Sequence, residues 1–151
     1  MSGIARRPPT VLVSGTASDS HTWNLVFLQL LIEELGYHVV NLGPCVPDEL
    51  LVEECRRLGP AVVVISSVNG HGHQDGRRVA ARLRACAELA ATPLVIGGKL
   101  GTSGLDDTER ARALLAAGFD AVFEDSAGAV LDFRHFVQSI PARGPAELAP
   151  A

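Results

Sequence analysis

The residues of this chain best placed to do chemistry are Asp19 and His21, which lie two positions apart in the segment Ser18-Asp19-Ser20-His21. An apolar run at residues 11–14 precedes them, and apolar residues at helical spacing follow from Leu25 onward. The pair is therefore expected on the loop between a buried strand and a helix. A carboxylate so close to an imidazole can orient the ring and fix its tautomer, which leaves the second ring nitrogen free as a base or metal ligand.

The elements that must position this pair alternate between strands and helices. Five short runs rich in Val, Ile and Leu are typical of strands buried on both faces, and apolar residues at helical spacing follow each of them. We expect strands at residues 11–14, 38–42, 61–66, 94–96 and 121–123, and helices at 23–35, 48–57, 75–90, 107–117 and 127–139. This order predicts an α/β fold: a single flavodoxin-like (Rossmann-like) doubly wound domain, with a five-stranded parallel sheet flanked by helices.

Residue types at the expected helix ends support these boundaries. Gly36, Gly59 and Gly118 follow helical runs, where a glycine commonly ends a helix. Pro47-Asp48 and Leu105-Asp106-Asp107 stand at two expected helix starts.

Composition and charge narrow the class of protein. The 151 residues are 47% hydrophobic and 20% charged, which suits one globular domain, expected at residues 10–140 with flexible tails at 1–9 and 141–151. A net charge of −4 argues against a nucleic-acid partner, and no apolar run is long enough for a membrane span. Cys45, Cys55 and Cys86 match no zinc or redox spacing, so we expect free thiols in a reducing, cytoplasmic location.

Two more loops are expected at the same edge of the sheet as His21. The segment from Ser66 to His73 follows the third strand, and Gly97-Gly98-Lys99-Leu100-Gly101 follows the fourth. Ligands of open parallel sheets bind beyond the carboxyl ends of the strands. Small residues let a bulky group approach the backbone, and Ser and Asn side chains can hydrogen-bond to it. The sequence thus predicts a crevice lined by Gly and Ser, with one imidazole at its mouth.

Several common sites do not fit these loops. Gly97-Gly98-Lys99 lacks the spacing of a phosphate-binding loop, no dinucleotide fingerprint follows the first strand, and no Gly-x-Ser-x-Gly elbow is present. His71 and His73 could form a metal pair, but without a carboxylate or Cys at ligand spacing a solvated loop is the favoured interpretation. Taken alone, the Asp19–His21 pair is also typical of a local hydrogen-bonded turn or a helix cap.

Together, the three loops resemble cobalamin-binding domains in which a protein histidine displaces the lower axial base. That family carries Asp-x-His-x-x-Gly after the first strand, Ser-x-Leu after the third and Gly-Gly after the fourth. The corresponding segments here are Asp19-Ser20-His21-Thr22-Trp23-Asn24, Ser66-Ser67-Val68 and Gly97-Gly98. The resemblance covers residues 10–138 and is strongest to the small, cobalamin-binding subunits of glutamate (methylaspartate) mutases.

The resemblance implies a role for each loop. His21 would bind the cobalt of adenosylcobalamin, and Asp19 would accept a hydrogen bond from the other ring nitrogen. Ser66 would hydrogen-bond to the displaced lower base, and Gly97 and Gly98 would leave room for it. The implied cofactor-binding residues are Ser18, Asp19, Ser20, His21, Thr22, Asn24, Ser66, Val68, Asn69, Gly70, Gly97, Gly98 and Lys99.

The resemblance also implies that the chain acts as one subunit of a carbon-skeleton mutase, with glutamate as the expected substrate. It would dock on a larger catalytic barrel subunit, and an apolar rim of Pro44, Val46 and Leu100 is the expected docking surface. Asn24 replaces the family Gly and Val68 the family Leu. Asn24 favours one alternative, a degenerate cobalamin-binding fold that acts as an interaction protein. A second alternative, a stand-alone cobalamin carrier or sensor module, also stays open.

Overall fold

The computed structural model describes residues 8–101, 107–125 and 128–140. The greater part of both predicted tails and the expected helix start at Leu105-Asp106 lie outside the described residues. The elements are β1 (Thr10–Gly15), α1 (Trp23–Glu34), β2 (His38–Asn41), α2 (Asp48–Leu58), β3 (Val62–Ser66), α3 (Gly72–Arg84), a short 3₁₀ helix η1 (Ala87–Leu89), β4 (Leu94–Gly98), α4 (Asp107–Ala117), β5 (Ala121–Glu124) and α5 (Ala129–Ser139).

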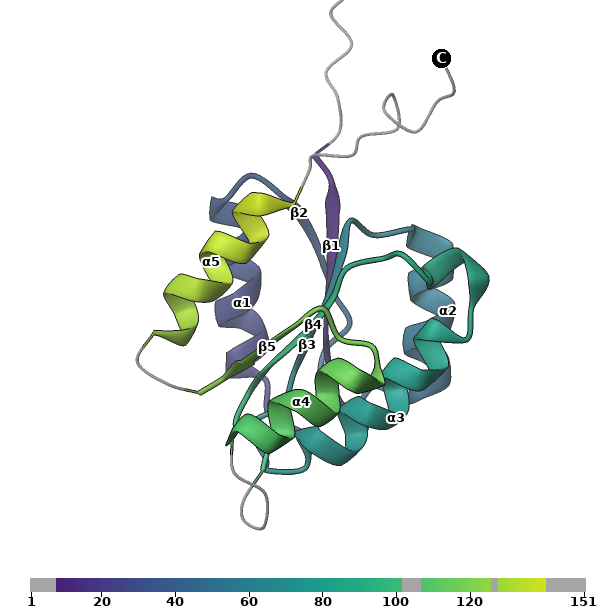
Figure 1. Cartoon of the computed structure of the whole chain (residues 1–151). Helices are drawn as coiled ribbons and strands as arrows, with labels where there is room; N and C mark the ends of the chain where they lie inside the picture. The colour runs from purple at the N-terminus through teal and green to yellow at the C-terminus, as the bar shows by residue number, and fades with distance from the viewer. Residues whose placement is uncertain (1–7, 102–106, 126–127, 141–151) are drawn as a thin grey trace, which may run out of the picture.

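The five strands form one parallel sheet in the order β2-β1-β3-β4-β5. Helices α1 and α5 cover one face of the sheet, and α2, α3 and α4 cover the other (Figure 1). This is the flavodoxin-like, doubly wound arrangement, so the predicted fold class is confirmed. None of the helices in the described part of the chain is long and apolar enough to cross a membrane.

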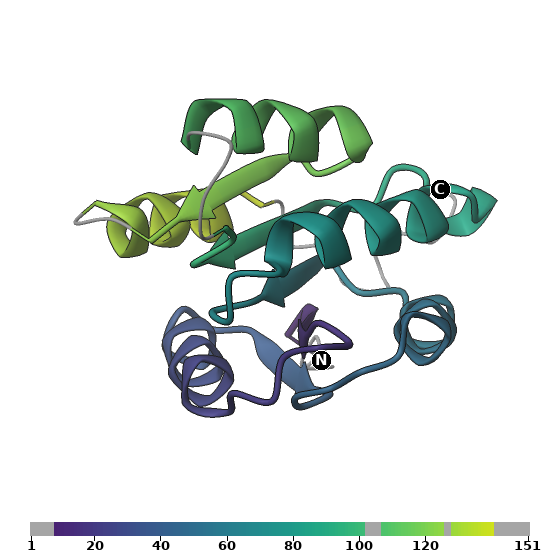
Figure 2. The same ribbon diagram turned by 90° about the horizontal axis from the view of Figure 1, so that it is seen from below.

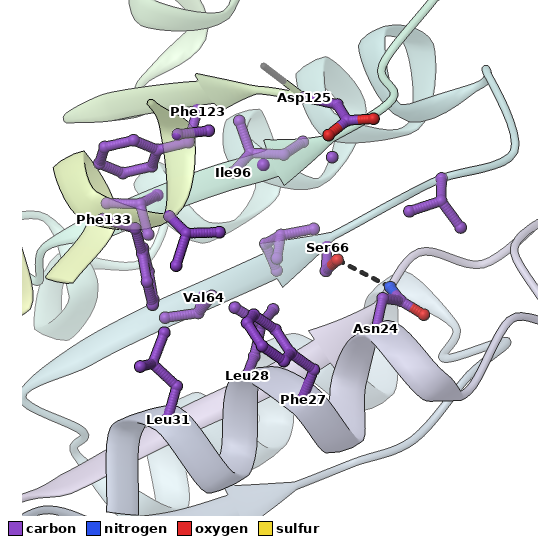
Figure 3. Close-up of a pocket in the computed structure, with 17 residues that line it drawn as sticks. Asn24, Phe27, Leu28, Leu31, Val64, Ser66, Ile96, Phe123, Asp125 and Phe133 are labelled. Atoms are coloured by element: carbon purple, nitrogen blue, oxygen red, sulfur yellow. Dashed lines mark hydrogen bonds between the residues drawn. The ribbon is translucent and has the colours of Figure 1, made fainter. Parts of the chain in front are cut away.

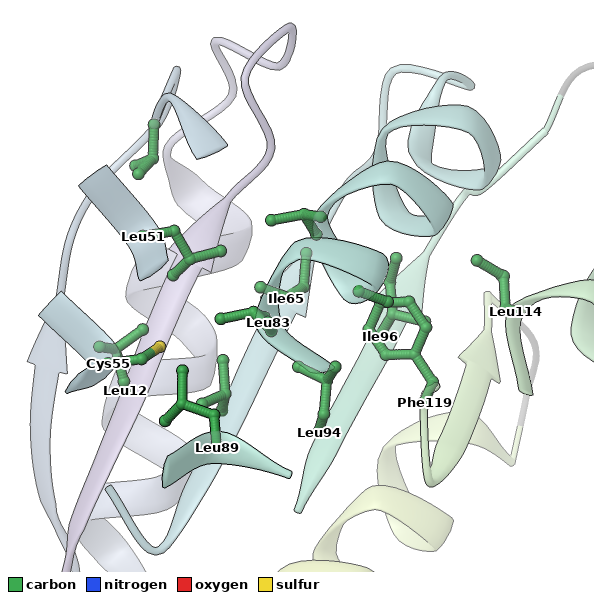
Figure 4. Packing of buried hydrophobic residues seen from close by; sticks show 14 of the residues in the cluster. Leu12, Leu51, Cys55, Ile65, Leu83, Leu89, Leu94, Ile96, Leu114 and Phe119 are labelled. Atoms are coloured by element: carbon green, nitrogen blue, oxygen red, sulfur yellow. The ribbon is translucent and has the colours of Figure 1, made fainter. Parts of the chain in front are cut away.

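Alternating strand residues supply two separate hydrophobic clusters, one on each face. Leu12, Ile65 and Ile96 pack under α2, α3 and α4 (Figure 4). Val13 and Val64 pack under α1 and α5. Because both faces are covered, the strands are apolar along their length, which is the pattern that identified them in the sequence.

Two element boundaries differ from the prediction at the edge that carries the three loops. Strand β4 continues through Gly97 and Gly98, because these residues pair with Phe123 and Glu124 of β5 rather than forming a loop. Gly98 has φ +110°, and a Cβ there would lie 2.2 Å from the Ser67 carbonyl oxygen. Helix α3 begins at Gly72, three residues earlier than expected, and ends at Arg84.

The helix ends follow the sequence signals only in part. Gly36 and Gly118 have positive φ just after α1 and α4, and Gly59 caps α2 in the left-handed conformation, as predicted. Pro47 occupies the N-cap of α2 without a side-chain capping bond. The Asp48 carboxylate accepts hydrogen bonds from Arg78 of α3 instead.

The carboxyl ends of the strands meet at one edge of the sheet, which Figure 2 views from below. There the loop after β1 lies beside the loop that leads from β3 into α3 (Figure 2). The Val68 N–H, from the second loop, donates a hydrogen bond to Asp19 in the first. The fold therefore brings two of the predicted site segments into direct contact.

Candidate functional site

His21 lies at this edge with one ring nitrogen bonded and the other free to bind a ligand. Its Nδ1 is 2.6 Å from Oδ1 of Asp19, and its backbone N–H donates to the same oxygen at 2.9 Å. The Asp19 side chain is 1% exposed, whereas that of His21 is 59% exposed. A carboxylate on Nδ1 favours the tautomer with its proton there, so Nε2 carries the lone pair that can bind a metal.

Asp19 also joins the two loops through its second oxygen. Oδ2 accepts a hydrogen bond from the Val68 backbone N–H at 2.7 Å and from the Ser67 hydroxyl at 3.2 Å. Burial alone raises the pKa of Asp19, but the hydrogen bonds from His21, Val68 and Ser67 outweigh it, so the pKa lies below its usual value. An ionised Asp19 is the acceptor that a neutral His21 needs in order to keep its proton on Nδ1.

A second carboxylate, Asp75 of α3, holds the residue next to Asp19. Its Oδ2 accepts the Ser18 hydroxyl at 2.5 Å, while Nδ2 of Asn69 donates to the Ser18 backbone oxygen at 3.1 Å. Arg78 bonds to both Asp75 and Asp48, which connects this network to α2. Burial raises the pKa of Asp75, and the bonds from Ser18 and Arg78 lower it to a net value below the usual one. The loop that presents His21 is therefore anchored to the helices of the opposite face.

Beside this edge, a cavity of about 200 Å³ opens between the sheet, α1 and α5 (Figure 3). Its walls are apolar, and the aromatic rings of Phe27, Phe123 and Phe133 contribute to them. The polar side chains in the lining belong to Asn24, Ser66 and Asp125. For scale, a dry protein cavity of about 150 Å³ can bind benzene, so this space suits a larger aromatic group.

The polar end of the cavity is formed by Asn24 in the first turn of α1 and Ser66 at the end of β3. Nδ2 of Asn24 donates to the Ser66 hydroxyl oxygen at 2.7 Å (Figure 3). The amide oxygen of Asn24 is buried and has no hydrogen-bond partner in the described structure. Buried polar atoms are almost always paired, so an unpaired acceptor beside a cavity is consistent with a missing ligand.

The structure gathers most of the predicted site residues but gives them different positions. Val68, Gly97 and Gly98 line the cavity together with Asn24 and Ser66. The Gly70 N–H donates to the Lys99 carbonyl oxygen, which joins the second and third loops. The remaining predicted side chains of the first and third loops, Ser20, Thr22 and Lys99, are exposed.

The structure distinguishes the two local interpretations of the Asp19–His21 pair, which are a hydrogen-bonded turn and a helix cap. The bond from the His21 N–H to Asp19 is the local hydrogen-bonded turn, and it coexists with the bond to the imidazole. The pair does not cap α1, whose N-cap is Thr22 with no side-chain capping bond. His71 is the N-cap of α3 and His73 lies in the first turn of that helix, so the segment is not the solvated loop that the sequence favoured. Among the described residues, no group of three or more His, Cys, Asp and Glu side chains could hold a metal ion.

The prediction that Pro44, Val46 and Leu100 form an exposed docking surface is wrong. Val46 and Leu100 are 4% and 0% exposed, because both belong to the core under α2, α3 and α4. Instead, α1 exposes Trp23, Phe27 and Leu30, at 84%, 52% and 60%, on successive turns of one helix face.

Sequence reasoning missed the roles of Ser67 and Asp75. Ser67 directly follows a predicted site residue, so the repeated serine was a signal for it. Asp75 lies 57 positions from Ser18, and no local pattern connects the two.

Comparison with known proteins agrees with these features. The model of the B12 binding domain family matches residues 9–134. The chain is 29% identical to the glutamate mutase sigma subunit of Halobacterium salinarum over 91% of this chain and 92% of that protein. It is 32% identical to the glutamate mutase sigma subunit of Carboxydothermus hydrogenoformans over 70% and 77%, respectively.

Solved structures show the same fold. A cobalamin-binding protein from Desulfitobacterium hafniense superposes with a TM-score of 0.67 at 18% identity, over 86% of this chain and 59% of that one. The methanol:cobalamin methyltransferase complex MtaBC of Methanosarcina barkeri gives 0.66 at 20% identity, over 91% and 50%. The present chain thus spans between half and three-fifths of these two chains. A chemotaxis response regulator of Vibrio cholerae gives 0.63 at 14% identity, over 86% and 98%.

Proposed function

The chain belongs to the B12-binding domain family, and from this premise we propose that it is the small, cobalamin-binding subunit of an adenosylcobalamin-dependent carbon-skeleton mutase. The expected reaction interconverts L-glutamate and 3-methylaspartate. The relatives that carry the name glutamate mutase sigma subunit support this choice over a stand-alone carrier.

The observation that carries the proposal is the state of His21. Its Nδ1 is bonded to a buried carboxylate and its side chain is 59% exposed, so Nε2 is available for cobalt. The hydrogen bond that its Nδ1–H donates to Asp19 makes the ring a stronger ligand and limits its rotation. With His21 as the cobalt ligand, the lower base of the cofactor would be held elsewhere on the chain.

The cavity beside α1 is the place for that displaced base. Its apolar, aromatic lining fits a flat ring system, and the Ser66 hydroxyl and Asn24 amide supply polar contacts at one end. The role of the chain's own residues is then to bind the cofactor tail and to orient the cobalt ligand. When bound, adenosylcobalamin supplies a cobalt–carbon bond whose homolysis starts radical chemistry.

The substrate would bind to a larger catalytic barrel subunit that docks over the edge carrying His21. This assignment explains why His21 is exposed. The partner subunit would also cover the exposed apolar side chains of α1. It is tested by mixing the cobalamin-loaded chain with the large subunit and measuring conversion of L-glutamate to 3-methylaspartate.

Cobalt coordination is tested first, on the isolated chain. The cobalt(II) form of the bound cofactor is examined by electron paramagnetic resonance with natural and ¹⁵N-labelled protein. We expect splitting from one histidine nitrogen that changes on labelling and disappears in His21→Ala.

His71→Ala provides the matched control, because His71 is also an exposed histidine on a neighbouring loop. It should keep the full signal. A labelled-nitrogen signal that survives His21→Ala rejects His21 as the ligand. If the unaltered chain does not bind cobalamin at all, the degenerate-fold alternative replaces the proposal.

A further inference from the structure

The Ser66 hydroxyl has few possible partners. Ser66 lies between Gly15 of β1 and Gly97 of β4 in the sheet register, so neither lateral neighbour offers a side chain. Its residue is 3% exposed, and its one hydrogen bond in the described structure is the bond from Asn24. The remaining direction open to the hydroxyl is the cavity that Ser66 helps to line (Figure 3).

The bond from Asn24 fixes which way the Ser66 proton points. The amide nitrogen of Asn24 has two protons and no lone pair, so at 2.7 Å it donates and the Ser66 oxygen accepts. A hydroxyl has one proton and two acceptor lone pairs. Because one lone pair faces Asn24, the proton is directed away from it and toward the cavity. Accepting this bond also makes the hydroxyl a better donor.

We propose that Asn24 sets the polarity of the Ser66 hydroxyl, so that the cavity selects a cofactor tail with a hydrogen-bond acceptor on its ring. This inference rests on the proposed function and extends it to the class of lower base. A benzimidazole-type base displaced by His21 has an unprotonated ring nitrogen that accepts such a bond. A phenolic base has no ring nitrogen, and it would leave the buried Ser66 proton unpaired.

The test compares affinities for two cobamides that share phosphate and ribose but differ in the lower base, one benzimidazole and one phenolic. Binding is followed by visible absorption. Because the benzimidazole base must first be displaced from cobalt, at a cost that is the same for every variant, the quantity compared is the change in the affinity ratio between variants. In Asn24→Leu the Ser66 hydroxyl keeps its proton but loses the bond that directs and polarises it, so the ratio of the two affinities should fall by about twofold to threefold. Removal of the hydroxyl in Ser66→Ala should lower the ratio by about fivefold to tenfold, as for one neutral hydrogen bond.

Asn24→Asp tests the direction of the bond rather than its presence. A carboxylate of the same shape accepts the Ser66 proton and turns the oxygen lone pairs toward the cavity. The affinity ratio should therefore fall at least as far as in Asn24→Leu. Any repulsion between the new charge and the cofactor phosphate affects both cobamides and cancels in the ratio.

Three controls make the result decisive. Cobinamide, which lacks the whole nucleotide tail, should bind every variant with unchanged affinity, since its binding requires a folded His21 loop but no cavity. Gln29→Leu removes an amide from the same helix at a position outside the cavity lining, and it should leave the ratio unchanged. In Ser66→Ala the ratio should already be low, and adding Asn24→Leu should not lower it further.

Two results overturn the inference and one overturns its premise. An unchanged ratio in both Asn24→Leu and Asn24→Asp shows that Asn24 does not set the polarity. A loss of cobinamide affinity in those variants assigns Asn24 to the His21 loop instead. If none of the three corrinoids binds the unaltered chain, the proposed function fails and the inference fails with it.

Discussion

The two faces of the sheet are packed differently, although the same five strands form both. Under α2, α3 and α4, large side chains fill the space completely enough that a Cβ added at Gly76 would lie 2.6 Å from Ile96 (Figure 4). Under α1 and α5 a cavity of about 200 Å³ remains, and Phe27 at its edge is half exposed. Tight packing stabilises a fold, whereas a preformed apolar cavity costs stability and suits a ligand. The comparison assigns stability mainly to the first face and cofactor binding to the second.

The largest effect is expected from opening a cavity in the filled face. Leu114 of α4 is fully buried in the cluster that also contains Ile96. We expect Leu114→Ala to lower the free energy of unfolding by about 2–5 kcal/mol, measured by urea denaturation. The matched change on the other face is Phe27→Ala, which should cost about 1 kcal/mol or less because that ring is 52% exposed. Equal losses would show that the two faces contribute alike.

A smaller effect is expected from Asp19, which anchors the His21 loop. Asp19→Asn keeps the shape of the side chain but replaces one of its two carboxylate oxygens with an NH₂ group. Both oxygens accept hydrogen bonds from N–H or O–H groups, and the NH₂ group cannot accept them. The expected loss at neutral pH is about 2 kcal/mol. The folded-state pKa of Asp19 is below the usual value, so its contribution is fully present above pH 4 and is lost as the pH falls through the lower folded value.

The measurement is the free energy of unfolding between pH 7 and pH 2 for both proteins. Their difference should be constant above pH 4 and shrink below it. Glu53→Gln, which changes an exposed carboxylate in the middle of α2, is the matched control. A difference that is the same at every pH would mean that the Asp19 charge does not contribute.

Substitutions that enlarge a side chain should lower stability on the filled face and weaken cofactor binding on the face that carries the cavity. Gly76→Ala on the filled face forces Ile96 and Leu114 to move and should cost about 1–2 kcal/mol, even though alanine favours the helix. Ala129→Leu on α5 extends a side chain into the cavity and should change stability by less than about 1 kcal/mol. It should weaken cobalamin binding at least tenfold while cobinamide still binds. Equal loss of both corrinoids would place the cofactor tail outside the cavity.

How far the sequence predicted the fold also differs between elements. The five strands were predicted because burial on both faces makes each of them a short apolar run, and the helices because their apolar residues recur at helical spacing. Two of the errors occur where glycine carries no periodic signal, and a third is the end of α3, which stops at Arg84 before a separate 3₁₀ helix rather than running to residue 90. Gly97 and Gly98 are strand residues because of their pairing with β5, and Gly72 begins α3 without a capping side chain.

The candidate site was predictable where its residues are close in the sequence. Asp19 and His21 are two positions apart, so their contact followed from local geometry. Asp75 bonds to Ser18 across 57 positions, and the cavity depends on how α1 and α5 lie over the sheet; neither leaves a local pattern. The docking rim failed for the same reason, since hydrophobicity alone does not distinguish buried Leu100 from exposed Leu30.

The smallest effect on stability, and the sharpest test of the open face as a partner surface, is expected from Trp23. Its side chain is 84% exposed two positions after His21, so Trp23→Ser should change the free energy of unfolding by less than about 0.5 kcal/mol. Exposed tryptophans often dominate the energy of an interface. We therefore expect the same change to weaken association with the large catalytic subunit at least tenfold, measured by titration calorimetry, with cobalamin binding to the isolated chain unchanged. Leu115→Ser on α4 is the control, because it alters an exposed apolar residue on the other face of the sheet. If Trp23→Ser leaves association intact, the partner contacts another part of this edge, and the bare face of α1 is not its docking site.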